Sequence, residues 1–183
     1  MKKSLLILGL CLVTSGLYAQ GTVNFNNRVL ASGVSAPVLQ DGGAAANSGF
    51  VGQLWYSNAG TWAAVGAALP FRDGAGASFL NTTGASTSRD LLGVVPGTLA
   101  TIQMRAWSAT YGTYTEAMNG AVGTQYGLSP ELTLLTGGAG SPPGLPADLV
   151  GLQGFTMTTV VPEPSVIMLG IAGAGLLWFR RKK

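Results

Sequence analysis

The segment Leu99–Ser108 limits the fold of this chain most strongly, because every second residue from Ala100 to Ala106 is apolar. One set of side chains is Ala100, Ile102, Met104 and Ala106, and the other is Thr101, Gln103, Arg105 and Trp107. A period of two places these sets on opposite faces of a β-strand, whereas a helix would distribute them around its axis. The segment therefore predicts a long strand with one face against a core.

The rest of the middle of the chain extends this pattern. Phe50–Ser57 alternates in the same way, and Trp62–Leu69 returns antiparallel to it after a turn. Further short strands are expected at Thr22–Val29, Ala77–Leu80, Leu91–Val95, Leu132–Leu135 and Phe155–Val161. The turns between them are rich in Gly and Pro, as at Pro96-Gly97. About eight to ten strands predict an all-β, antiparallel β-sandwich of jelly-roll or immunoglobulin-like type, with a barrel as the alternative.

One short segment leaves two structures open. Tyr111–Thr115 is compatible with a strand that pairs back across Ser108–Thr110. Glu116-Ala117-Met118 is compatible with a single helical turn instead.

The N-terminus predicts a secretory signal peptide over residues 1–19. Lys2 and Lys3 form a positive region, Leu5–Val13 is apolar, and small and polar residues lead to a cleavage site after Ala19. The expected partners of this end are a signal peptidase and the secretion machinery.

The C-terminus has three parts with different physical roles. Pro162-Glu163-Pro164 favours extended backbone, because each proline fixes φ and restricts the residue before it. Val166–Phe179 carries no charge and would extend for about 21 Å as a helix, which is short for a hydrocarbon core of ~30 Å. The basic tail Arg180, Arg181, Lys182 and Lys183 would stay on the cytoplasmic side. Residues 161–183 thus predict a marginal transmembrane helix that follows a recognition motif.

This combination of motif, apolar helix and basic tail resembles the PEP-CTERM sorting signal of Gram-negative bacteria. The resemblance implies recognition by an exosortase, a membrane-embedded cysteine transpeptidase that passes its substrates to the cell surface or to an exopolysaccharide matrix. An ordinary C-terminal membrane anchor is the alternative. Gly21–Asn27 and Thr101–Trp107 are also similar to stretches in other exported proteins that carry this signal, a family of unknown function. The expected organisation is a signal peptide (1–19), a β-sandwich domain (20–160) and a sorting signal (161–183), with only transient contact with the inner membrane.

The net charge of +3 comes from the two ends of the chain. Between Gln20 and Val161 there are four arginines and six acids, a formal charge of −2. Because this part of the chain has no cluster of Lys and Arg that could bind the phosphates of a nucleic acid, no nucleic-acid partner is expected.

The residue types exclude most catalytic chemistry. The chain has no His, its single cysteine, Cys11, lies in the signal peptide, and the middle of the chain has no Lys. This removes Ser–His–Asp and Cys–His catalysis, zinc sites and lysine-based covalent catalysis. Asp41 and Asp73 precede glycines as turn residues do, and no loop has the alternating acids of a dedicated calcium loop. We therefore expect no enzyme, no cofactor and no metal site, with a carboxylate pair or a scattered calcium site as the alternatives.

The aromatic residues are the best candidates for a binding surface, since their flat faces suit sugar rings and protein partners. They are Trp55, Tyr56, Trp62, Trp107, Tyr111, Tyr114 and Tyr126. Trp55 and Trp107 share strand faces with polar residues, and Arg105 lies on the same face as Trp107. These three residues are the predicted ligand-binding group, with packing in the core as the alternative for the tryptophans.

The sequence predicts a structural or adhesive protein of the cell surface or extracellular matrix. Its first rival is a carbohydrate-binding module that uses exposed aromatic residues, and its second is a glycan-acting enzyme that uses two of the acids.

Overall fold

The computed structural model describes residues 20–58 and 60–161, and this part of the chain is all-β. The predicted signal peptide, the Pro162-Glu163-Pro164 motif, the apolar run and the basic tail lie outside the described residues. In the part that is described, no helix is long and apolar enough to cross a membrane.

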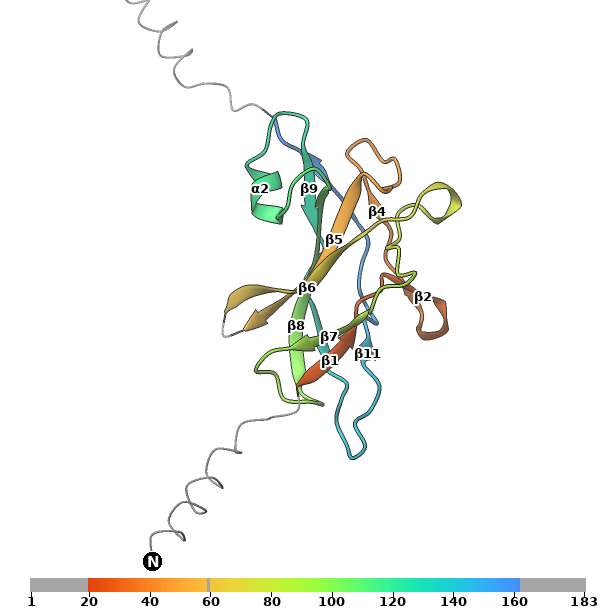
Figure 1. Ribbon diagram of the computed structural model, residues 1–183, viewed down its shortest axis with the longest axis vertical. Helices are drawn as coiled ribbons and strands as arrows, with labels where there is room; N and C mark the ends of the chain where they lie inside the picture. Colours follow the sequence, from red (N-terminus) through yellow and green to blue (C-terminus); the bar gives the residue numbers. More distant parts are fainter. Residues whose placement is uncertain (1–19, 59, 162–183) are drawn as a thin grey trace, which may run out of the picture.

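The largest sheet has six strands, in the order β13-β9-β8-β5-β6, with β10 also paired to β8 (Figure 1). Its strands are β5 (Phe50–Asn58), β6 (Thr61–Pro70), β8 (Leu99–Ser108), β9 (Gln125–Leu128), β10 (Leu132–Leu135) and β13 (Thr158–Thr159). All of its pairings are antiparallel. The hairpin of β5 and β6 and the long strand β8 confirm the strands predicted from alternation.

A second sheet has three strands in the order β11-β1-β7: β11 (Ala147–Asp148), β1 (Gly21–Asn24) and β7 (Ser88–Leu91). Two small sheets complete the described fold. They pair β2 (Arg28–Val29) with β3 (Val34–Ser35), and β4 (Val38–Leu39) with β12 (Phe155–Thr156). The short helices are η1 (Leu30–Ser32), η2 (Gly74–Gly76) and α2 (Tyr114–Met118).

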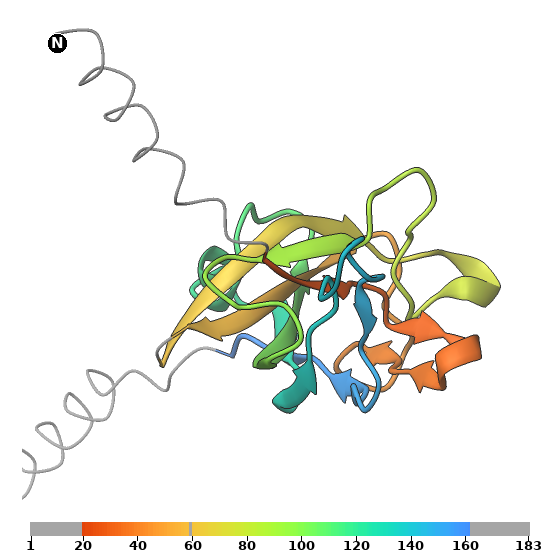
Figure 2. The same ribbon diagram turned by 90° about the horizontal axis from the view of Figure 1, so that it is seen from below.

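Two of these pairings are parallel and join the beginning of the described chain to its end. β1 pairs with β11, and β4 pairs with β12. Figure 2 shows the early segments in red and orange beside the late segments in blue. The expectation of antiparallel pairing throughout is therefore wrong at these two places, where segments distant in sequence meet instead of hairpin partners.

The core forms on one face of the long strands, as alternation predicts. Leu54, Ile102 and Met104 are fully buried, and Gly52 faces them. A Cβ atom on Gly52 would come within 2.8 Å of the Met104 methyl carbon, so a larger residue here would force Met104 to shift. Other residues of the same cluster come from β1, β4, β7 and the loops: Val23, Phe25, Val38, Phe71, Leu80, Leu91, Leu149 and Met157.

The predicted strand over Thr22–Val29 is interrupted between β1 and β2. The reason is Asn27, which is fully buried, and whose amide bonds to three backbone groups of other segments. A turn that directs this side chain inward replaces regular strand pairing.

Other predicted strands differ from the structure in position. Ala77–Leu80 forms only an isolated bridge between Leu80 and Phe71. The strand expected at Leu91–Val95 ends at Leu91, because Val94 closes a turn by donating its N–H to the Leu91 carbonyl at 3.1 Å. Phe155–Val161 is divided into β12 and β13, which join different sheets. The sequence did not predict β9 at all.

The helical alternative for the segment after β8 is correct. Thr113 caps α2, since its hydroxyl accepts from the Glu116 N–H at 3.2 Å and the Glu116 carboxylate accepts from the Thr113 N–H at 3.0 Å. This reciprocal capping stabilises a helix of a single turn. It also places Tyr114 and Ala117 against Trp107 on the outer face of the main sheet.

Candidate functional site

The outer face of the main sheet holds two of the three predicted binding residues together. Arg105 of β8 is opposite Gln53 of β5, and Trp55 is opposite Gln103, so Arg105 and Trp55 are diagonal neighbours. The Arg105 guanidinium carbon lies 4.1 Å from the centre of the Trp55 ring, 5.1 Å from that of Tyr114 and 5.6 Å from that of Trp62. We call these four residues the Arg105 cluster. At such distances each ring face attracts the cation.

A chain of hydrogen bonds through Gln103 and Ser129 holds the Arg105 guanidinium in place. Arg105 Nε donates to Gln103 Oε1 at 3.1 Å, and Gln103 Nε2 donates to the Ser129 carbonyl at 3.1 Å. The Ser129 hydroxyl accepts from the Met104 N–H at 3.0 Å. Gln103 and Ser129 are both buried. The orientation of Arg105 therefore depends on the backbone of the sheet rather than on a flexible surface contact.

The electrostatics of the cluster are those of a half-buried cation. Burial lowers the pKa of Arg105, and the coulombic effect of Tyr114 raises it. Within the described residues no carboxylate contributes to this pKa. The pKa of Tyr114 is raised, mainly by burial. Arg105 opposes this shift, and Tyr126 adds to it. Since an arginine stays charged at any physiological pH, the cluster presents a positive charge framed by aromatic rings.

Trp107, the third predicted binding residue, packs in a small second core. It is only 1% exposed, and its ring meets Tyr114 edge-on at 6.1 Å. Its indole Nε1 donates to the Tyr111 carbonyl at 2.9 Å. The structure thus adopts the packed alternative for Trp107, because α2 covers this part of the sheet.

Trp55 is half-buried, and its indole Nε1 is buried without a hydrogen-bond partner among the described residues. Trp62 and Tyr114 join Arg105, although the sequence identified them only as aromatic candidates. Grouping them requires the register of β5 with β6, which sets Trp62 opposite Ser57, and the fold of α2, which brings Tyr114 over β8. Neither is a local property of the sequence.

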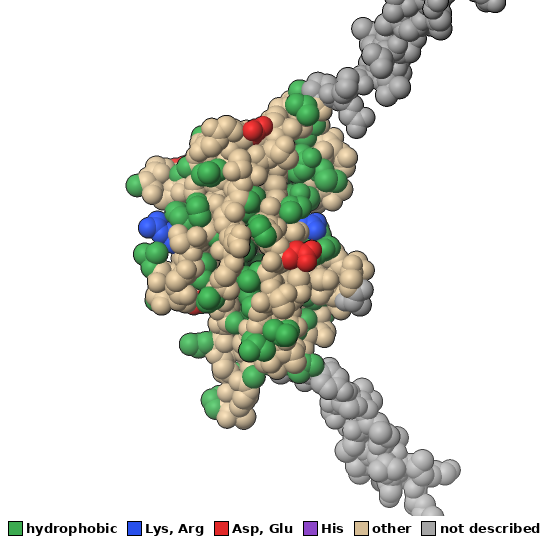
Figure 3. All heavy atoms as spheres, turned by 180° about the vertical axis from the view of Figure 1, so that it is seen from behind, with side chains coloured by type: hydrophobic (Ala, Val, Ile, Leu, Met, Phe, Trp, Pro, Cys, Tyr) green, Lys and Arg blue, Asp and Glu red, His purple; other side chains and the backbone are tan. Residues whose placement is uncertain are grey.

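Most of the acids have structural partners. Asp41 accepts from the Thr159 N–H at 3.2 Å, Glu116 caps α2, and Asp148 accepts from the Asn24 amide at 2.6 Å. Asp73 accepts from the Ser48 N–H at 3.0 Å, and this bond lowers its pKa. The described chain contains no group of three or more acids that could hold a metal ion. Figure 3 shows how few charged side chains one face of the molecule carries.

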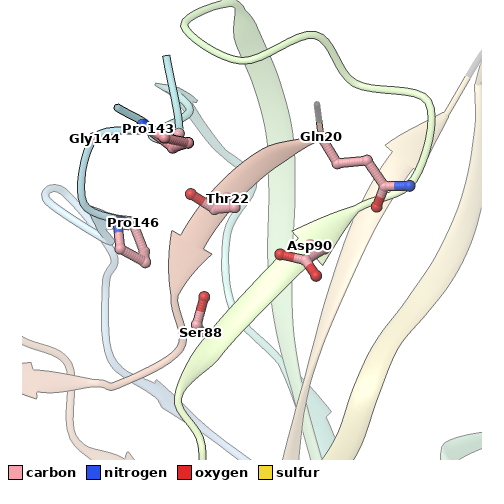
Figure 4. Close-up of a pocket in the computed structure, with 8 residues that line it drawn as sticks. Gln20, Thr22, Ser88, Asp90, Pro143, Gly144 and Pro146 are labelled. Atoms are coloured by element: carbon pink, nitrogen blue, oxygen red, sulfur yellow. The ribbon is translucent and has the colours of Figure 1, made fainter. Parts of the chain in front are cut away.

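A separate hollow, which the sequence did not predict, lies over the three-stranded sheet (Figure 4). Its volume is about 510 Å³, and it is lined by Gln20, Thr22, Ser88, Asp90, Gly138, Pro143, Gly144 and Pro146. The sequence signal for it is the Gly/Pro-rich loop 137–146, but only the long-range pairing of β1 with β7 and β11 shows that strands lie beneath this loop.

No family model matches the chain, and no curated protein or solved structure is significantly similar to it.

Proposed function

We propose that this chain is an exported protein, sorted by a PEP-CTERM-type signal, whose β domain has a structural or adhesive role at the cell surface or in the extracellular matrix. The supporting observation is the extent of the fold. In the described part of the chain, the strands run from Gly21 to Thr159. All of them fall between the two signals predicted from sequence, so cleavage at Ala19 and near Pro162 would remove none of these strands.

We further propose that the domain is a β-sandwich. The six-stranded and three-stranded sheets share one core, in which Val23 and Leu91 of the smaller sheet join Leu54 and Ile102 of the larger. The red beginning and the blue end of the described chain lie at opposite ends of the view in Figure 1. A protein attached through its C-terminal end would therefore present the Gln20 end to its surroundings.

The chemistry of the domain supports a non-catalytic role. The middle of the chain has no His, Cys or Lys. Four of its six acids are bonded to a backbone N–H or an amide within the fold. A glycan-acting enzyme needs two carboxylates that face one another across the scissile bond. Although Asp148 is bonded to Asn24, Asp90 and Asp148 line adjoining hollows and are therefore the pair to test for such activity.

The sorting proposal is tested by replacing Pro162-Glu163-Pro164 with Ala-Ala-Ala in the producing cell. We expect the altered protein to stay with the membrane and to keep its C-terminal segment, because the exosortase would have no motif to recognise. A second variant with Gln at residues 180–183 should also be mislocalised, since the charges that fix its orientation are lost. Pro130→Ala, which changes an exposed proline outside the signal, is the matched control. Normal processing and surface delivery of both signal variants would refute the proposal.

A second candidate function, carbohydrate binding, is favoured by the Arg105 cluster. Trp55 and Trp62 are half-buried rings beside a cation that has no carboxylate near it in the described part of the chain. Such a group suits an acidic sugar, whose ring would pack on an indole while its carboxylate accepts from the guanidinium.

The test is binding of a hexagalacturonate to the full-length protein. Arg105→Gln should weaken binding more than about tenfold, equivalent to about 1.4 kcal/mol. The control is Arg28→Gln, because Arg28 also lies over an aromatic ring, that of Phe79 at 4.6 Å, but on another part of the surface. Equal effects of the two substitutions would point to non-specific charge attraction, and absence of binding would remove this candidate.

A further inference from the structure

The hollow over the three-stranded sheet is part of a longer groove. A second hollow of about 320 Å³ adjoins it and shares Ser88 and Pro146 with it. The second hollow is lined by Asn24, Thr87, Ser88, Leu145, Pro146 and Asp148. The floor is formed by outward-facing residues of β1, β7 and β11, which strand pairing places side by side. An elongated, open groove suits a chain-like ligand better than a compact one.

The wall of the groove is fixed by backbone bonds. The Gly137 N–H donates to the Thr22 carbonyl at 2.8 Å, and the Thr22 N–H donates to the Gly137 carbonyl at 3.2 Å. At the other end of the loop, Ala147 pairs with Val23. Inside the loop, the Gly144 N–H donates to the Ala139 carbonyl at 3.0 Å. The loop is therefore attached to β1 at both ends, and a ligand would meet a groove that is largely formed in advance.

The polar groups of the groove are prepared for hydrogen bonding. The Thr22 hydroxyl is buried under the loop and has no partner among the described residues, so the groups open to a ligand are those of the other lining residues. Asn24 Nδ2 donates to Asp148 Oδ1 at 2.6 Å, which leaves the other carboxylate oxygen of Asp148 beside the amide. Asp90 is exposed. In Figure 4, Thr22, Ser88 and Asp90 border the same space, opposite Pro143 and Pro146.

The charge of the lining selects the class of ligand. The residues that line both hollows include two acids, Asp90 and Asp148, and neither Lys nor Arg. An anionic chain would be repelled here, in contrast to the Arg105 cluster. Adjacent acceptors and donors, as at Asp148 and Asn24, match neighbouring sugar hydroxyls, and the faces of Pro143 and Pro146 offer apolar contact to the sugar ring.

We propose that this groove is a binding site for a neutral polysaccharide chain. Sugar hydroxyls donate to the carboxylates of Asp90 and Asp148, while the loop 137–146 covers one side of the chain. The site is distinct from the Arg105 cluster, and it does not depend on how the protein is sorted.

The test uses the full-length protein in a non-glycosidic detergent, with calorimetric titration of four neutral probes: cellohexaose, maltohexaose, xylohexaose and mannohexaose. At least one should bind, and Asp90→Asn should weaken that binding about tenfold or more. Because Asp90 is exposed, this substitution should leave the fold unchanged.

Two variants serve as controls. Glu131→Gln changes an exposed acid outside the groove and should leave binding unchanged, and Arg105→Gln should do the same. Failure of all four neutral probes to bind, or binding that Asp90→Asn leaves within about twofold, would overturn the proposal. Preferential binding of hexalysine would overturn it too, and would identify the groove as a site for a cationic peptide.

Discussion

Replacement of Asn27 by alanine should be among the most damaging single changes to this domain. Asn27 is fully buried, and its Nδ2 donates to the Ala36 carbonyl at 2.8 Å and to the Ser78 carbonyl at 3.1 Å. Its Oδ1 accepts from the Leu80 N–H at 2.8 Å. One side chain thus joins the segment after β1 to two other parts of the fold.

The expected cost follows from what alanine leaves behind. The Leu80 N–H and the Ala36 carbonyl each lose the partner that Asn27 supplies, at about 1–3 kcal/mol for each buried group. The Ser78 carbonyl loses less, because it still accepts from the Val38 N–H at 3.0 Å. We expect Asn27→Ala to lower the free energy of unfolding by about 3–5 kcal/mol, a large part of the 5–15 kcal/mol typical of a folded protein.

Denaturant unfolding followed by tryptophan fluorescence measures this loss. Asn26→Ala is the matched control, since the only hydrogen bond of the Asn26 side chain in the described part of the chain is the exposed one that its Oδ1 accepts from the Arg28 N–H at 3.0 Å. It should cost no more than about 1 kcal/mol. Equal and small losses for the two variants would refute the argument that Asn27 holds these segments together.

Three further predictions follow from other contacts. Gly52→Ala should destabilise the fold by about 1–3 kcal/mol in the same unfolding assay, because the new methyl group meets Met104 and Leu80; an unchanged stability would contradict the packing. Tyr114 should ionise above its ordinary pKa of 10.0, mainly because burial disfavours the phenolate. Stability in the same unfolding assay should therefore fall as pH rises from 10 through the pKa in the folded state, and Tyr114→Phe should remove this fall. The bond from the Ser48 N–H lowers the pKa of Asp73 below 3.8, so its stabilising effect should be present above pH 3.8 and be lost below it. Asp73→Asn should abolish that part of the acid dependence.

Local patterns in the sequence predicted the parts of the fold that depend on local geometry. Alternation predicted β5 and β8 and the faces that they bury, since a period of two is a property of each strand alone. Pro96-Gly97 predicted a turn, and the Thr98 N–H does bond to the Val95 carbonyl at 3.2 Å, with Gly97 at φ 73°.

The remaining features depend on contacts between distant residues. The Asn24–Asp148 bond spans 124 residues, and the parallel pairing of β1 with β11 that creates the groove spans a similar distance. Asn27 resembles a turn residue until its buried partners are known. β9 is short and has little alternation, so its pairing with β8 determines it.

The candidate site shows the same division. The sequence predicted that Arg105 and Trp107 point to the same face of one strand, and in β8 they do. It could not predict that α2 buries Trp107, or that cross-strand register places Trp55 rather than Trp107 under the guanidinium. The face to which a side chain points is determined by its own strand, whereas its neighbours on the sheet are determined by strand pairing.

The most direct test of the central proposal is the intact mass of the protein recovered from the surface or extracellular fraction of the producing cells. The proposal predicts a chain that begins at Gln20 and ends close to Pro162-Glu163-Pro164, without the apolar run and the basic tail. Recovery of a chain that still carries residues 165–183 would contradict it.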